Sequence, residues 1–123
     1  NKITDEGAHA LGDLLNCNST LRKLFLGRNK IKDEGISIIL ADCQMNNPLE
    51  YLDLHDNNAS VAGKEKIPYV FSFDTTFEGR VEKFDPEAQN KVLLRDRASW
   101  FGRLKMYDHA FKTLQSVFKF HPD

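Results

Sequence analysis

The amino-acid sequence repeats itself at an offset of 28 residues, and this repeat constrains the fold more than any other feature. Residues 1–7 read NKITDEG and residues 29–35 read NKIKDEG, so six of seven positions are identical. A third copy begins at Asn57 and retains Gly63, but Ala59 stands where the first two copies have isoleucine. Near-copies of this length predict small units that stack, because one unit cannot bury its apolar face alone.

Each copy predicts a short strand. Leu24 and Leu26 alternate with Lys23 and Phe25, and the same pattern returns in residues 51–54. Alternation with a period of two places one set of side chains in the core and the other set outside.

Each copy also predicts a helix, which opens with Asp-Glu at residues 5–6 and 33–34, where carboxylates favour the positive end of the helix dipole. Asn29 and Asn57 follow the two predicted strands, at turns where an amide can satisfy backbone groups of neighbouring copies. Apolar residues then recur at helical spacing and predict one buried stripe on each helix: Ala8, Leu11 and Leu15, and Ile36, Ile39 and Cys43.

The run LxxLxLxxNxIxDEG, from Leu21 to Gly35, resembles a leucine-rich repeat of the ribonuclease-inhibitor-like class. The resemblance covers residues 1–63. It implies an α/β fold, a solenoid of strand-turn-helix repeats with a concave strand face that binds proteins. Two repeats and a decaying third are fewer than such arrays need, so we expect an α-rich C-terminal cap or helical hairpin to close the stack.

Residues 64–85 predict an aromatic-rich connector or cap. Pro68 predicts the end of any helix that begins near Val61. The spacing of Tyr69, Phe71 and Phe73 predicts a strand, and that of Phe77, Val81 and Phe84 predicts a short helix. We interpret these aromatic side chains as a plug for the open end of the stack, with an exposed docking strip as the alternative.

Residues 86–123 predict a helical hairpin that starts after Asp85-Pro86-Glu87 and breaks near Lys105 and Met106. Residues 91–123 also resemble a single tetratricopeptide unit, although Lys105 stands where that family usually has glycine and Arg97 occupies an apolar position; a generic helical cap is the alternative. Two apolar stripes predict the packed faces: Leu94, Ala98, Phe101 and Leu104, then Tyr107, Ala110, Phe111, Leu114, Val117 and Phe118.

Composition excludes several classes of function. The chain has 17 Lys and Arg against 18 Asp and Glu, which argues against a general nucleic-acid binder. No apolar run is long enough for a membrane span, no phosphate-binding glycine loop is present, and no metal-ligand spacing occurs, so we expect no cofactor and no metal. Two cysteines favour a reducing compartment, cytoplasmic or otherwise intracellular. Because Asn1 is not a start methionine, we expect a fragment or a processed chain.

Two clusters of side chains suggest a catalytic or nucleic-acid-binding site, but we interpret both as ordinary solvated surface residues. Asp53 and His55 could form a carboxylate–imidazole pair for base catalysis. No nucleophile or oxyanion donor accompanies them, so we expect that the chain is not an enzyme and that these side chains are solvated. Trp100 lies among basic residues that could bind nucleic acid, but the near-neutral charge favours a solvated helix face: Arg95, Arg97, Arg103 and Lys105. We expect Cys17 and Cys43 to be buried structural thiols.

Six side chains are expected to point outward from the concave strand face and to bind a partner: Lys23, Phe25, Arg28, Tyr51, Asp53 and His55. Phe25 and Tyr51 fall on neighbouring strands and should form one anchor. We therefore expect a non-enzymatic protein–protein interaction module or a structural subunit of a multi-subunit complex, with protein partners and neither nucleic acid nor membrane. The alternative is a regulatory leucine-rich-repeat segment of a larger nucleotide-dependent sensor or GTPase regulator.

Overall fold

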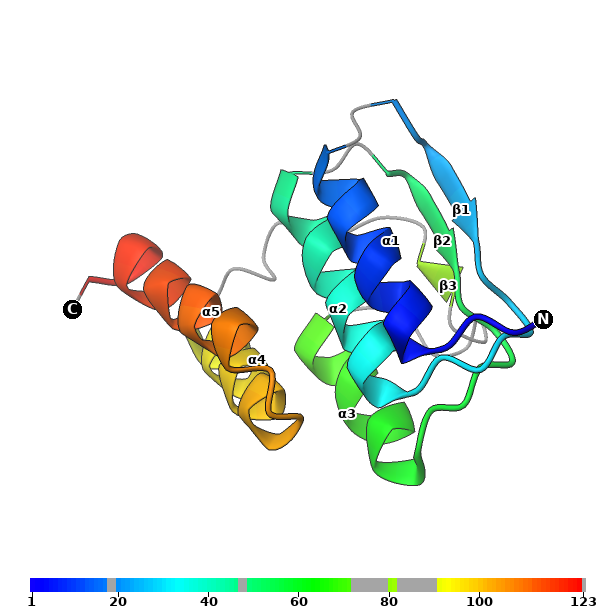
Figure 1. Cartoon of the computed structure of the whole chain (residues 1–123). Helices are drawn as coiled ribbons and strands as arrows, with labels where there is room; N and C mark the ends of the chain where they lie inside the picture. The colour runs from blue at the N-terminus through cyan, green and yellow to red at the C-terminus, as the bar shows by residue number, and fades with distance from the viewer. Residues whose placement is uncertain (18–19, 47–48, 72–79, 82–90, 123) are drawn as a thin grey trace.

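The computed structural model describes residues 1–17, 20–46, 49–71, 80–81 and 91–122. Helices α1, α2 and α3 form a layer with the strands on one side and a hairpin of α4 and α5 on the other (Figure 1). The elements follow in the order α1 (Asp5–Cys17), β1 (Lys23–Phe25), α2 (Asp33–Asn46), β2 (Tyr51–Asp53), α3 (Val61–Phe71), β3 (Arg80–Val81), α4 (Lys91–Arg103) and α5 (Tyr107–Phe120).

The solenoid of strand-turn-helix repeats predicted from the 28-residue period is wrong. The described residues are mostly helical, and their strands are only two or three residues long. Strands β1 and β2 are parallel, with Leu24 opposite Leu52, but β3 joins β2 in the antiparallel direction, with Val81 opposite Leu52. The parallel pairing of successive copies therefore stops after two strands in the described sheet, and helices make up most of the described structure.

Side-chain amides join the copies where the sequence predicts it. Asn29 Oδ1 accepts a hydrogen bond from the Ile3 N–H, and Asn57 Oδ1 accepts the equivalent bond from the Ile31 N–H, each at 3.1 Å. The Asn57 Nδ2 group also donates to the Leu26 carbonyl at 2.8 Å. Each asparagine thus supplies the hydrogen-bond partner that an unpaired backbone group of the preceding copy requires.

A second inter-copy contact uses the first residue of each helix. The Lys32 N–H donates to Asp5 Oδ1 at 2.6 Å, and the Ser60 N–H donates to Asp33 Oδ1 at 2.8 Å. The next position in this register is Val61, which is exposed and has no carboxylate. The contact consequently ends with the third copy, in agreement with its decaying sequence.

Helix α2 lies at the centre of the molecule and is buried on more than the single predicted stripe. Ile36 and Ile39 are buried as expected, but so are Ile38 and Leu40 on its other faces. The hairpin covers the side of α2 that faces away from the strands, where the Trp100 Nε1–H donates to Ser37 Oγ at 2.8 Å. Trp100, Phe101 and Met106 belong to the same apolar core as the leucines of β1 and β2.

The secondary-structure predictions for residues 64–85 are wrong where the structure describes them, whereas the interpretation of this segment as an aromatic-rich connector or cap stays a prediction. Helix α3 does not end at Pro68 but continues to Phe71, so the strand predicted from Tyr69 is wrong up to that residue. Proline removes one helical hydrogen bond, but Ile67 is buried beside it and ties this turn to the core. Val81 lies in β3 rather than in the predicted helix. The remaining residues of these predictions lie outside the described ranges: Phe73, Phe77, Phe84 and Asp85-Pro86-Glu87.

Two helices lie within residues 86–123, where the sequence predicts a helical hairpin. Helices α4 and α5 pack against each other, and the chain turns between them at Leu104–Met106. Lys105 adopts a positive φ of 60°, the left-handed conformation that favours glycine. The second predicted apolar stripe is partly wrong, because only Val117 is buried, Ala110 is half-buried and four members are exposed: Tyr107, Phe111, Leu114 and Phe118.

Candidate functional site

An aromatic pair occupies the exposed face of the two parallel strands. Phe25 comes from β1 and Tyr51 from β2, and their ring centroids lie 5.3 Å apart with the planes tilted by 43°. Phe25 remains 63% exposed, although aromatic side chains of this size usually bury most of their surface. The pair predicted from the strand alternation is confirmed, and it presents an apolar surface on top of the strands.

Asp53 and His55 also meet at the end of β2, but Asp53 is not exposed as expected. His55 Nδ1 lies 2.6 Å from Asp53 Oδ1, and the same oxygen accepts the His55 N–H at 3.1 Å. The Asp53 side chain is only 8% exposed, against 22% for His55. Asp53 has a neighbouring residue on each side, Phe25 of β1 and Arg80 of β3, because β2 lies between these two strands in the described sheet.

Gly27 provides the room for the His55 ring. A Cβ atom at residue 27 would collide with the ring atoms Cε1 and Nδ1. The ring therefore lies directly over the backbone of the neighbouring copy, with Asp53 holding its Nδ1 side. These contacts fix the orientation of His55, since a ring that is packed on one face and hydrogen-bonded on its edge has little freedom to rotate.

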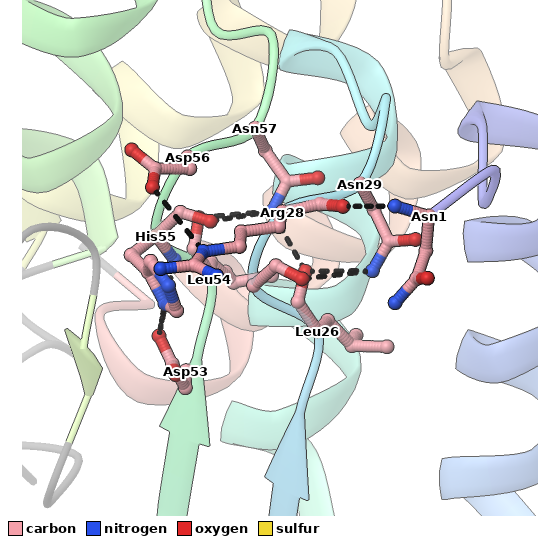
Figure 2. A network of polar contacts seen from close by, with 10 residues as sticks. Asn1, Leu26, Arg28, Asn29, Asp53, Leu54, His55, Asp56 and Asn57 are labelled. Carbon is pink, nitrogen blue, oxygen red and sulfur yellow. Dashed lines mark hydrogen bonds and ion pairs between the residues drawn. The ribbon is translucent and has the colours of Figure 1, made fainter.

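Arg28 and Asp56 occupy equivalent turns of the two copies. Both have a positive φ, 58° for Arg28 and 52° for Asp56, and the Arg28 N–H donates to the His55 carbonyl at 2.8 Å. Figure 2 shows the Arg28 side chain directed toward Asp56, with Nε 3.9 Å from Oδ2. Both side chains are largely exposed, so this ion pair contributes little to stability.

The structure thus brings five of the six predicted binding residues to one accessible surface, and it places Asp53 beneath them. We call this surface the strand patch. It combines an apolar centre with a basic margin and an oriented imidazole: Phe25 and Tyr51, then Lys23 and Arg28, then His55. Side chains of these types anchor protein interfaces.

The other candidate clusters of the sequence do not form sites. Trp100 is buried, so the basic patch around it is not a stacking surface. Arg95, Arg103 and Lys105 are exposed, as expected for a solvated face, but Arg97 is buried, contrary to that expectation. Desolvation by burial lowers the pKa of Arg97 to about 10. Cys17 is a free and exposed thiol, contrary to the prediction, and the side chain of Cys43 lies outside the description.

Neither a metal site nor a membrane span is found in the described ranges. No group of three or more His, Cys, Asp or Glu side chains there could hold a metal ion. None of the helices of this part of the chain has the length and apolar character to cross a bilayer.

Sequence reasoning missed a second accessible surface, on α5. Four apolar residues of α5 are exposed and recur with spacings of four, three and four: Tyr107, Phe111, Leu114 and Phe118. The helical periodicity predicts instead that they lie in the core of the hairpin. A signal was available, because the apolar residues of α5 cover a wider arc than one packed helix can bury.

Comparison with known families supports the repeat. The model of a leucine-rich repeat family matches residues 17–44, which include β1 and most of α2. This part of the chain is a leucine-rich repeat segment, and such a segment suggests protein partners. No curated protein and no solved structure matches the chain. The tetratricopeptide resemblance of residues 91–123 stays a prediction.

Proposed function

We propose that this chain is a non-enzymatic protein-binding module that engages its partner through the strand patch. The observation that carries the proposal is the pair formed by Phe25 and Tyr51, with 5.3 Å between the ring centroids and Phe25 63% exposed. Exposed aromatic side chains that already pack on each other lose little conformational freedom on binding, so more of the contact energy contributes to affinity.

The margin of the patch indicates what the partner presents. Lys23 and Arg28 are exposed, and the Arg28 side chain forms a long, solvent-exposed ion pair with Asp56. Such a pair exchanges readily for a carboxylate of another protein. The matching partner surface carries an apolar side chain that packs on the rings and acidic side chains that approach the margin.

Asp53 and His55 have a supporting role in this proposal. Both a ring nitrogen and the backbone N–H of His55 use the same Asp53 oxygen, and the ring rests on Gly27. This arrangement supports a fixed contact residue rather than a base, because Asp53 and Gly27 hold the ring in one orientation.

The class of leucine-rich repeat is proposed from the sequence resemblance. We propose that the repeat belongs to the ribonuclease-inhibitor-like class of leucine-rich repeats, and that the chain acts in a reducing, intracellular compartment as part of a multi-subunit complex. The free thiol of Cys17 supports a reducing compartment.

Binding measurements with a double variant test the proposal. The full chain, immobilised as wild type and as Phe25→Ala/Tyr51→Ala, is exposed to a native extract, and captured proteins are quantified by mass spectrometry. A partner identified in this way is then purified and titrated. We expect its Kd to rise by about 30-fold or more in the double variant, as is typical for two anchor residues.

The matched control is Phe111→Ala, which removes an equally exposed phenylalanine from α5, 62% against 63%. This variant should bind the partner as wild type does. Circular dichroism and thermal unfolding establish that both variants fold. A partner that binds the double variant with unchanged affinity would show that the site lies elsewhere.

A further inference from the structure

We infer that α5 is a dimerisation helix, and that it pairs in the antiparallel direction with α5 of a second copy of this chain. Four apolar residues of α5 are exposed on one helix face: Tyr107, Phe111, Leu114 and Phe118. We call this face the α5 stripe. It lies on the hairpin, across the helical layer from the strand patch (Figure 1), and the inference does not depend on the proposed function.

The spacing of the α5 stripe favours a second helix as its occupant. The intervals of four, three and four residues are those of the a and d positions of a heptad repeat. Side chains at these positions pack between those of a facing helix, whereas a flat partner would contact only part of the stripe.

The order of the intervals favours a second copy in particular, because it reads the same from either end of the stripe. In an antiparallel pair, Tyr107 would lie opposite Phe118 of the second copy, and Phe111 opposite its Leu114. Every member then has an apolar partner, and the contact obeys the two-fold symmetry of closed dimers.

Charge on the flank of the stripe is complementary in the same arrangement. Asp108 lies in the first turn of α5 and Lys119 in its last turn. By helical spacing of 100° per residue, both fall on the same side of the stripe. Antiparallel pairing brings each Asp108 to the level of Lys119 in the second copy, so two opposite-charge contacts form by symmetry, whereas parallel pairing would leave Asp108 and Lys119 of the two copies at opposite ends of the interface.

The area of the stripe is compatible with a weak dimer. An aromatic side chain carries about 150–250 Å² of surface, so three that are about two-thirds exposed, with Leu114, offer roughly 400 Å² on each copy. Two stripes together with the flanking side-chain stems approach about 1,000 Å², the lower limit for a specific interface. We therefore expect a dimer that dissociates on dilution.

Sedimentation velocity of the full 123-residue chain tests the inference. A monomer–dimer equilibrium should appear between about 1 and 200 µM. Phe111→Glu should weaken the dimer by at least tenfold, since it buries a charge without a partner. Phe118→Glu should do the same. The matched control Phe25→Glu, at an equally exposed phenylalanine of the strand patch, should leave the dimer unchanged.

A charge swap tests the direction of the helices. Asp108→Lys should weaken the dimer by about threefold to tenfold, and adding Lys119→Asp should restore it, because each exposed pair contributes up to about 1 kcal/mol. The double variant opposes the helix dipole at both ends, so recovery reports the contact between copies and not the stability of α5.

Several outcomes would overturn the inference. These are a chain that remains monomeric over the whole concentration range, a dimer that persists in Phe111→Glu and Phe118→Glu, and a dimer that Phe25→Glu weakens equally. A charge swap that fails to restore the dimer would overturn the antiparallel arrangement. None of these results bears on partner binding by the strand patch, so the two proposals fail separately.

Discussion

Asn57 shows how much one side chain contributes to the junction between copies. Its Oδ1 accepts from the Ile31 N–H, and its Nδ2 group lies within hydrogen-bonding distance of three carbonyls, those of Leu26, Leu54 and His55. The amide therefore satisfies backbone groups of two copies at once. An aspartate of the same shape could accept but not donate, so it would leave these carbonyls without a donor.

We predict that Asn57→Ala lowers the free energy of unfolding by about 2 kcal/mol, because partly buried backbone groups lose their partners. The matched control is Asn58→Ala, whose side chain is exposed and whose backbone alone bonds to Ile31. It should change stability by less than about 0.5 kcal/mol. Urea unfolding at neutral pH measures both variants, and equal effects would contradict this role of Asn57.

For single residues, the sequence predicts those contacts that depend on local chemistry. The positions of Asn29 and Asn57 indicate their function, because a turn in a repeat leaves the same backbone groups unpaired each time. The burial of Asp53 was not predictable, since alternation along β2 contains no information about β3, which pairs with it from 27 residues away. Lys105 adopts a glycine-like φ that its residue type does not indicate.

Among the elements, α1 and α2 approach each other closely through a glycine. A Cβ atom at Gly12 would lie 3.0 Å from Ile38 Cγ2 and would collide with the buried carboxylate of Asp42. Neither neighbour is free to move outward, because both belong to the central helix α2 and are buried. Gly12 therefore sets the distance between the two helices.

We predict that Gly12→Ala destabilises the protein by about 1–2 kcal/mol, as overpacking outweighs the gain in helix propensity. Gly102→Ala in α4 is the matched control, since a Cβ atom there meets nothing within 4 Å. It should stabilise the protein by up to about 1 kcal/mol. Thermal unfolding monitored by circular dichroism distinguishes these opposite signs, and a stabilising Gly12→Ala would contradict the close approach.

Periodicity predicts that an element exists better than it predicts the partner of that element. The spacing in residues 107–118 indicates a helix, and α5 is there, but spacing alone did not reveal which apolar face meets α4. Residues 61–71 form a helix despite Pro68, because burial of Ile67 compensates for a lost hydrogen bond. Such compensation depends on tertiary contacts and not on the local sequence.

In the molecule as a whole, His109 reports on the junction between the hairpin and the repeat segment. It lies at the start of α5 and contacts Phe101 of α4, with 5.4 Å between the ring centroids. Burial lowers the pKa of His109 below its usual 6.5, and Lys112 and His9 lower it further. Asp42 of α2 and Asp108 act in the opposite direction but do not reverse the shift.

This lowered pKa makes the stability contributed by His109 dependent on pH. The unfolded chain binds a proton at this residue as the pH falls through 6.5, while the folded chain still resists protonation. The contribution is therefore complete above pH 6.5 and declines below it. Compared with His109→Gln, wild type should lose stability in urea unfolding as the pH falls below 6.5. An equal pH dependence of the two proteins would contradict this prediction.

The arrangement of the whole chain was only partly predictable. The period of 28 residues indicates a leucine-rich repeat, and the family match at residues 17–44 confirms that segment. The solenoid inferred from it was wrong, because two copies are too few to determine the architecture and the hairpin shares their core. The contact between Trp100 and Ser37 joins residues 63 positions apart, and no repeat in the sequence encodes it.

The bond between Trp100 and Ser37 has a consequence for anyone who divides this protein into pieces. A truncation after α3 would strip the indole from α2 and leave a hydroxyl and its apolar surroundings open to water. The severed hairpin would lose the surface on which Trp100 rests. We expect neither fragment, the repeat segment or the hairpin, to express well alone. When both are produced together, they should associate and restore the fold, as the fragments of a split reporter do.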